Sequence, residues 1–116
     1  MLDHYVVFRA RPGRDKELTG ALAEFAAAIS GLDCLHEIAS GENINASGLQ
    51  RGYTHGCLAR LTSEQALKTD YWHHPAHQRL LGQLDELCED RFALDYDVAP
   101  ARELPLHRAA ATAVSR

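Results

Sequence analysis

The chain has 116 residues, a formal net charge of −4 and a charged fraction of 24%, which together indicate one globular domain. The longest basic cluster, Arg9 to Arg14, is too short to indicate a nucleic-acid partner. No apolar run reaches the roughly 18 residues that a membrane span needs, and the N-terminus lacks a signal-peptide pattern, so we expect a cytoplasmic protein.

The first half of the chain predicts a strand, a helix and a second strand. Residues 4–9 are β-branched and aromatic, are apolar on both faces and end at a Pro-Gly turn. Apolar residues at helical spacing from Leu18 to Ile29 then predict a helix over residues 15–30, with Asp15 as its N-cap. Residues 34–39 alternate weakly as a strand and lead into a loop rich in Gly and Asn.

The second half predicts a strand, two helical pieces and a last strand. Residues 53–61 form the strand, with Tyr53 and His55 on the same face. A short helix capped by Ser63 extends to about residue 70, and Pro75 begins the next helix. The apolar face of that helix runs from Leu80 to Cys88, and residues 91–98 form the last strand.

This βαββ(αα)β order predicts an α+β, ferredoxin-like fold, with a four-stranded antiparallel sheet covered by helices on one face. Apolar side chains on the other face, Tyr5, Val7 and Leu58, require another cover. A second copy of the sheet would supply it, so we predict a homodimer. The domain is predicted to span residues 1–98, and residues 99–116 a flexible tail. The alternative is an arm that packs on the partner subunit through Leu104 and Leu106.

The three cysteines, Cys34, Cys57 and Cys88, are widely spaced and form no CxxC pair. This pattern argues against a disulfide framework and a thiolate zinc site. Each cysteine stands beside a leucine, and a buried free cysteine packs like a small apolar residue. We therefore favour a structural role for all three over a nucleophilic or redox role.

Three of the seven histidines gather at the start of a predicted helix. With Pro75 at its first position, His74 becomes the N-cap and His77 falls in the first turn, where the helix dipole disfavours an imidazolium. His77 is therefore a candidate base near neutral pH, and Tyr71 a candidate donor to a carbonyl or enolate oxygen. The alternative is that His74 and His77 only cap and pack. His73 and His77 are spaced like a helical zinc pair, but Pro75 separates them and no HExxH pattern is present, so we predict no metal site.

Several segments together resemble a stress-responsive α/β-barrel (Dabb) domain over nearly the whole predicted fold. They are His4-Tyr5-Val6-Val7-Phe8-Arg9, Arg11-Pro12-Gly13, Gly41-x-Asn43, Arg51-Gly52-Tyr53-Thr54-His55-Gly56, His74-Pro75-Ala76-His77-Gln78 and Asp95-Tyr96. The resemblance implies a dimeric α+β barrel in which two ferredoxin-like sheets associate. It also implies a small-molecule pocket that works without a cofactor.

The same resemblance suggests roles for individual residues. Plant polyketide cyclases of this kind perform an intramolecular aldol condensation with a His–Tyr pair, which matches His77 and Tyr71. The resemblance assigns catalysis to these two residues and places His4 and His55 in the same pocket. We predict His4, His55, His74 and Tyr53 as substrate-binding residues. Two other functions stay open: a non-catalytic stress or ligand-binding dimer, and, by analogy of fold alone, a cofactor-independent monooxygenase.

Overall fold

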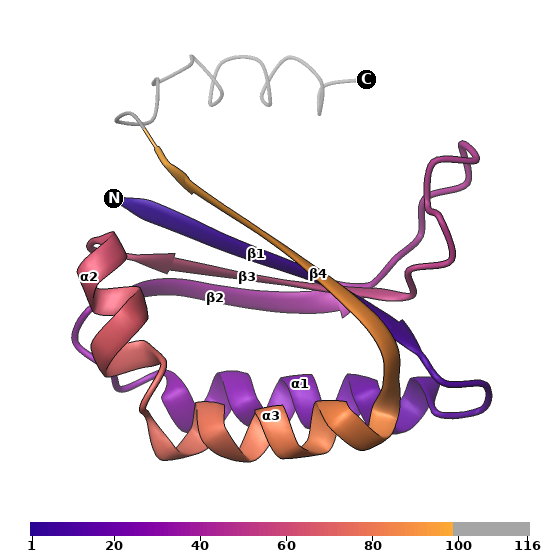
Figure 1. The fold of residues 1–116 in the computed structure, drawn as a ribbon, viewed down its shortest axis with the longest axis horizontal. Helices are drawn as coiled ribbons and strands as arrows, with labels where there is room; N and C mark the ends of the chain where they lie inside the picture. Colours follow the sequence, from indigo (N-terminus) through magenta and orange to yellow (C-terminus); the bar gives the residue numbers. More distant parts are fainter. Residues whose placement is uncertain (99–116) are drawn as a thin grey trace, which may run out of the picture.

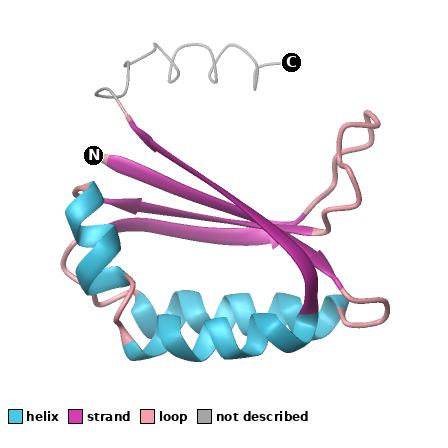
Figure 2. Ribbon diagram, viewed as in Figure 1, coloured by secondary structure: helices cyan, strands magenta, loops and turns pink. Residues whose placement is uncertain are grey.

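The helices of residues 1–98 all lie against one face of an antiparallel sheet (Figures 1 and 2). The structure, a computed structural model, describes residues 1–98. The predicted tail at 99–116, with Leu104 and Leu106, lies outside the described residues. Within residues 1–98, no helix combines the length and the apolar character needed to cross a membrane.

The order of elements is the predicted βαββ(αα)β, and the sheet order is β2-β3-β1-β4. This confirms the α+β, ferredoxin-like fold. The elements are β1 (Leu2–Ala10), α1 (Asp15–Ile29), β2 (Leu35–Glu42), β3 (His55–Leu61), α2 (Glu64–Ala66), the π-helical turn η1 (Leu67–Tyr71), α3 (Pro75–Leu87) and β4 (Cys88–Asp97).

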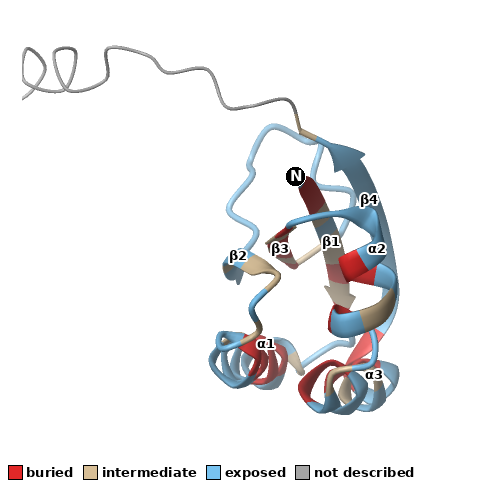
Figure 3. Cartoon of the chain, turned by 90° about the vertical axis from the view of Figure 1, so that its left-hand side faces the viewer, coloured by how far each residue is buried: buried red, intermediate tan, exposed pale blue. Residues whose placement is uncertain are grey.

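The core lies between the sheet and the pair α1 and α3, which run side by side beneath it (Figure 1). Leu18, Leu22 and Phe25 of α1 are buried, as the helical spacing predicts. Leu80 and Leu84 of α3 are buried in the same core. Figure 3 shows that the buried sides of α1 and α3 face each other and the sheet. This packing fixes where α3 begins, and with it the position of His77.

No helix of the described residues 1–98 covers the opposite face of the sheet. Cross-strand pairing places Tyr5 opposite both Leu58 of β3 and Leu94 of β4. On this face Tyr5, Phe92, Leu94 and Tyr96 are between 42% and 56% exposed. The prediction that the helices leave an apolar sheet face uncovered is therefore confirmed. We call the patch formed by these four residues the open face.

Several predicted boundaries were wrong: β1 begins at Leu2 rather than at residue 4, and β2 ends at Glu42 rather than at residue 39. Asp15 is not the N-cap of α1: Arg14 holds that position without a capping side chain, and Asp15 lies in the first turn. Cys88 is extended, so β4 begins at Cys88 rather than at residue 91. Tyr53 precedes β3, which begins at His55, because residues 51–52 form a turn with positive φ angles.

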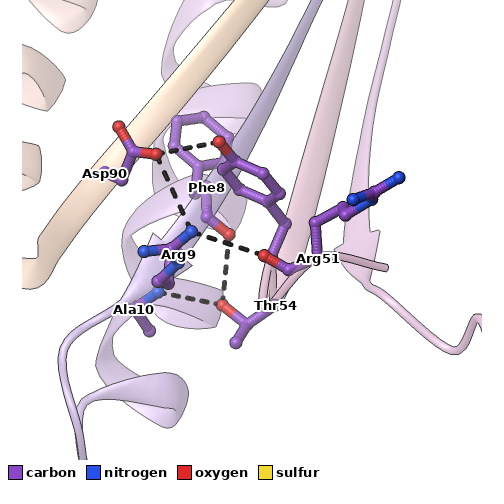
Figure 4. A network of polar contacts seen from close by, with 7 residues as sticks. Phe8, Arg9, Ala10, Arg51, Thr54 and Asp90 are labelled. Atoms are coloured by element: carbon purple, nitrogen blue, oxygen red, sulfur yellow. Dashed lines mark hydrogen bonds and ion pairs between the residues drawn. The ribbon is translucent and has the colours of Figure 1, made fainter. Parts of the chain in front are cut away.

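Tyr53 belongs instead to a polar network with Arg9 and Asp90 at the end of β1. Figure 4 shows this network, with Arg9, Arg51 and Asp90 labelled. The Arg9 guanidinium lies over its ring, 5.2 Å from the centroid, and its hydroxyl donates to Asp90 Oδ2 at 2.8 Å. Arg9 Nη2 also donates to the Arg51 carbonyl at 3.3 Å. Gly52 has a φ of +79°, and a Cβ there would lie 3.3 Å from Arg9 Nε, so glycine is strongly favoured. The network anchors the long β2–β3 loop to the sheet.

Candidate functional site

A cavity of about 210 Å³ lies between the helix-covered face of the sheet and the segment from η1 to α3. Most of its lining is apolar, including Val6 and Phe25. The side chains with titratable nitrogen or oxygen atoms in the lining are His4, Tyr71, His77 and Arg91. A concave, mostly apolar space with a few converging polar groups is the usual form of a small-molecule site.

The chain between β3 and α3 positions Tyr71 and His77. Ser63 caps α2, as predicted, since its hydroxyl accepts from the Ala66 N–H at 3.1 Å. The helix then widens into η1, and the Trp72 N–H donates to the Leu67 carbonyl, five residues back, at 3.1 Å. Such π-helical turns are rare in proteins, and those that occur are often found at functional sites. The predicted N-cap of α3 is confirmed, because His74 Nδ1 accepts from the Ala76 N–H at 3.0 Å.

His77 is held as a neutral imidazole in a defined tautomer. Its Nδ1 lies 3.0 Å from the Trp72 carbonyl oxygen, which can only accept, so Nδ1 carries the proton. Burial lowers the pKa of His77, and this effect outweighs the hydrogen bond to the Trp72 carbonyl, which raises it; the charges of His4 and Arg91 add to the lowering. His77 is 5% exposed, and no hydrogen bond within residues 1–98 involves Nε2. Its unprotonated Nε2 is therefore available to accept a proton from a ligand.

Tyr71 lies beside this imidazole. The ring centroids of Tyr71 and His77 are 4.9 Å apart, and His4 meets Tyr71 edge-on at 5.8 Å. Tyr71 is only 2% exposed, and burial raises the pKa of its phenol, so the hydroxyl keeps its proton. No hydrogen bond among the described residues occupies that hydroxyl. It can therefore donate to an oxygen atom of a ligand.

Beside the cavity, outside its lining, lies a carboxylate to which the sequence analysis gave no role. His4 on β1 and Asp95 on β4 are cross-strand partners, and His4 Nδ1 bonds the Asp95 carboxylate. Because a carboxylate accepts, this contact places a proton on Nδ1 and orients the ring of His4. The pairing follows from the register between two strands that are far apart in the sequence, so the local pattern around Asp95 gave no signal for it.

The other three predicted site residues are not brought to this cavity. His55 is 1% exposed, but its two ring nitrogens lie 2.8 Å from the Thr19 and Thr54 hydroxyls, on the side of α1. His74 uses its Nδ1 to cap α3. Tyr53 lies in the network at the end of β1. The structure therefore brings together His77, Tyr71 and His4, and leaves His55, His74 and Tyr53 outside the lining of the cavity.

Cys57 is the cysteine that lines the cavity, and burial raises the pKa of its thiol to about 11. The thiol is therefore protonated at neutral pH and is a poor nucleophile. Cys34, Cys57 and Cys88 are all free. In the part of the chain that the structure describes, no group of three or more His, Cys, Asp or Glu side chains is arranged to hold a metal ion.

The four-stranded antiparallel sheet, the helices on one face and the cavity beneath it define an α+β protein of the ferredoxin-like class. The chain belongs to the Dabb family, because the family model for the stress responsive A/B barrel domain matches residues 2–98. No curated protein matches the sequence.

Solved structures show the same fold. A dimeric ferredoxin-like protein of unknown function from Jannaschia sp. CCS1 is 27% identical, with a TM-score of 0.75 over 84% of this chain and 98% of that one. A protein from Deinococcus radiodurans, named as a candidate antibiotic biosynthesis monooxygenase, is 16% identical, with a TM-score of 0.74 over 90% and 98% of the chains. A hydroxynitrile lyase from Passiflora edulis is 15% identical, with a TM-score of 0.68 over 88% and 96%.

Proposed function

We propose that this protein is a cofactor-free proton-transfer enzyme of the cyclase or lyase type, with His77 as its general base. The observation that carries the proposal is the buried, neutral His77 imidazole, whose Nδ1 proton is held by the Trp72 carbonyl. This contact leaves Nε2 free on an imidazole whose ring centroid lies 4.9 Å from that of Tyr71, and both rings line a largely apolar cavity. A base and a hydrogen-bond donor next to each other are what proton abstraction beside a carbonyl group requires.

The proposed reaction begins when His77 Nε2 takes a proton from the carbon next to a ketone. The C–H electron pair forms the enolate, and the Tyr71 hydroxyl donates a hydrogen bond to the enolate oxygen. The enolate carbon then attacks a second carbonyl of the same molecule, which forms a C–C bond and an alkoxide. The His77 imidazolium returns its proton to the alkoxide, and loss of water completes the condensation. The steps consume no oxidant or reductant.

The size of the cavity supports a small substrate. Its volume of about 210 Å³ lies below the roughly 300–1,000 Å³ typical of sites for drug-sized ligands. The resemblance to polyketide cyclases at His77 and Tyr71 supports the aldol chemistry. The structural similarity to a protein named hydroxynitrile lyase is compatible with lyase chemistry on the same scaffold.

Heptane-2,6-dione tests the proposal directly, because its intramolecular aldol condensation gives 3-methylcyclohex-2-enone and water, and the conjugated enone absorbs in the ultraviolet. We expect the wild-type protein to accelerate enone formation over buffer. His77→Gln keeps an amide donor for the Trp72 carbonyl but removes the base, and should lower the rate at least about 100-fold. Tyr71→Phe should lower it by a similar factor. His36→Gln, at an exposed histidine, is the matched control.

Two results would contradict this assignment. An unchanged rate in His77→Gln would show that His77 is not the base. No enone above the buffer rate with wild-type protein would argue for the second candidate function, a non-catalytic ligand-binding dimer. That candidate is favoured by His74, which caps α3, and by His55, which is held between two threonines. It predicts a marked loss of thermal stability when His74 and His77 are both replaced.

A cofactor-independent monooxygenase is the third candidate, and the Deinococcus radiodurans structure is the observation that supports it. Cofactor-free oxygenation of an electron-rich aromatic substrate would consume dissolved oxygen, whereas the aldol reaction would not. An oxygen electrode therefore separates the two chemistries.

The proposed assembly is a homodimer that packs through the open face. Four large apolar side chains, Tyr5, Phe92, Leu94 and Tyr96, are partly exposed there, and contiguous apolar surface of this kind usually marks an interface. The similar protein from Jannaschia is described as dimeric. The free thiols of residues 1–98 are compatible with the reducing cytoplasm, which we propose as the compartment.

A further inference from the structure

The cavity contains a single permanently charged side chain, Arg91. The guanidinium of arginine stays protonated at every physiological pH, and no Asp or Glu is among the described residues that line the cavity. His77 is held neutral and Tyr71 keeps its proton. Within residues 1–98, the lining therefore combines an apolar wall with one fixed positive charge, which favours a ligand that carries a negative charge.

The Arg91 guanidinium is not committed to a strong partner inside the protein. Its Nη2 lies 3.4 Å from Asp85 Oδ1, and the Arg91 and Asp85 side chains are 38% and 76% exposed. An exposed pair of this length contributes little to stability. A guanidinium has five N–H donors, and no other side-chain hydrogen bond of Arg91 is formed within the described chain. A ligand can therefore engage it.

Arg91 lies at the opposite end of the cavity from the proposed base. On the sheet, Arg91 is the cross-strand partner of Phe8, and Asp95 is the cross-strand partner of His4. Arg91 and Asp95 are four residues apart on β4, so these two positions lie roughly 13 Å apart along the strand. On α3, His77 lies in the first turn and Leu84, which also lines the cavity, lies two turns later. The Tyr71 ring contacts both His4 and His77, so these three residues occupy one end. An elongated ligand can reach Arg91 from there.

We propose that Arg91 determines substrate specificity by binding the carboxylate of a short dioxo acid, one of whose two ketones lies at His77 and Tyr71. The carboxylate matches the planar fork of the guanidinium, which can bind both oxygens at once. This assignment of the substrate class rests on the proposed function, because it uses His77 and Tyr71 as the ketone-binding end. It makes Arg91 a substrate-binding residue rather than part of the acid–base pair.

The test compares two probes with the same number of non-hydrogen atoms. 5-Oxohexanoate and heptane-2,6-dione differ only in that a carboxylate replaces one acetyl group. We expect wild-type protein to bind 5-oxohexanoate at least about tenfold more tightly than the dione in calorimetric titrations. Arg91→Leu should abolish the preference without weakening dione binding. Arg79→Leu, which removes an exposed arginine of α3 outside the lining, should keep it.

A second variant tests the proposal without altering Arg91. Asp85→Asn removes the competing carboxylate, so it should tighten 5-oxohexanoate binding and leave dione binding unchanged. Equal affinity of wild-type protein for the two probes, or a preference that persists in Arg91→Leu, would overturn the assignment. So would the absence of 5-oxohexanoate binding.

The outcomes also separate this inference from the proposed function. If the dione cyclises in a His77-dependent reaction but Arg91→Leu changes neither probe, the function stands and the role of Arg91 is wrong. If 5-oxohexanoate binds in an Arg91-dependent way but no dione cyclises, the anion site stands and the proposed catalysis is wrong.

Discussion

His77 should make the stability of this protein depend on pH in a predictable direction. Burial lowers the pKa of His77 below the ordinary value of 6.5, so the unfolded chain binds a proton at this site more readily than the folded chain. The stabilisation from the neutral imidazole is therefore fully present above pH 6.5 and is lost as the pH falls through the pKa of the folded state. For a single site the loss cannot exceed roughly 1.4 kcal/mol for each pH unit.

The variant that isolates this contribution is His77→Gln, which has no charge at any pH. Urea unfolding of the wild-type protein and the variant at equal protomer concentration, from pH 8 to pH 5, gives two free energies of unfolding at each pH. Other titrating groups are common to both proteins and cancel in the difference. We expect wild-type protein to lose stability relative to His77→Gln below pH 6.5. A difference that stays constant, or that grows in favour of wild-type protein at low pH, would refute the buried neutral imidazole.

Three further predictions concern the cap, the open face and the cavity thiol. His74→Ala removes the N-cap of α3 and should lower the free energy of unfolding by about 1 kcal/mol in urea titrations, whereas His74→Asn, which keeps a capping side chain, should lower it less. Leu94→Lys places a charge on the open face and should convert the proposed dimer to monomers in sedimentation experiments, and the exposed substitution Ala27→Lys on α1 should not. Cys57→Ala removes a protonated thiol and should leave the rate of dione cyclisation within about tenfold of wild type, whereas a complete loss would implicate Cys57 in the chemistry.

Elements with strong local signals could be predicted from the sequence, and the junction of α3 with β4 could not. In the sequence, Cys88 continues the helical spacing of Leu80 and Leu84, so the pattern predicts that the helix includes it. In the structure Cys88 is buried, but as the first residue of β4. No Gly or Pro separates the two elements. The change from helix to strand is set by packing against β1, which periodicity does not record.

The candidate site likewise contains some residues that the local sequence pattern predicts and others that it does not. His74, Pro75 and His77 form a local pattern, and the structure places them at the start of α3 as the sequence predicts. His55 shares the helix-covered face with Cys57, but side-chain alternation predicts only on which face of the sheet a residue lies. Its position along the sheet brings it to Thr19 of α1 instead of to the cavity. The contacts of His4 with Asp95, and the place of Arg91 in the lining, depend on pairing between distant strands.

The group that selects the tautomer of His77 is part of the main chain. The Trp72 carbonyl exists whatever side chain stands at that position, so mutation of residue 72 cannot delete the acceptor as mutation of a carboxylate would. The Trp72 side chain, which lines the cavity and is 46% exposed, is therefore free to change without direct loss of the base. A substitution at residue 72 can therefore change the lining of the cavity, and with it the ligand that fits, while the main-chain carbonyl still holds the Nδ1 proton of His77.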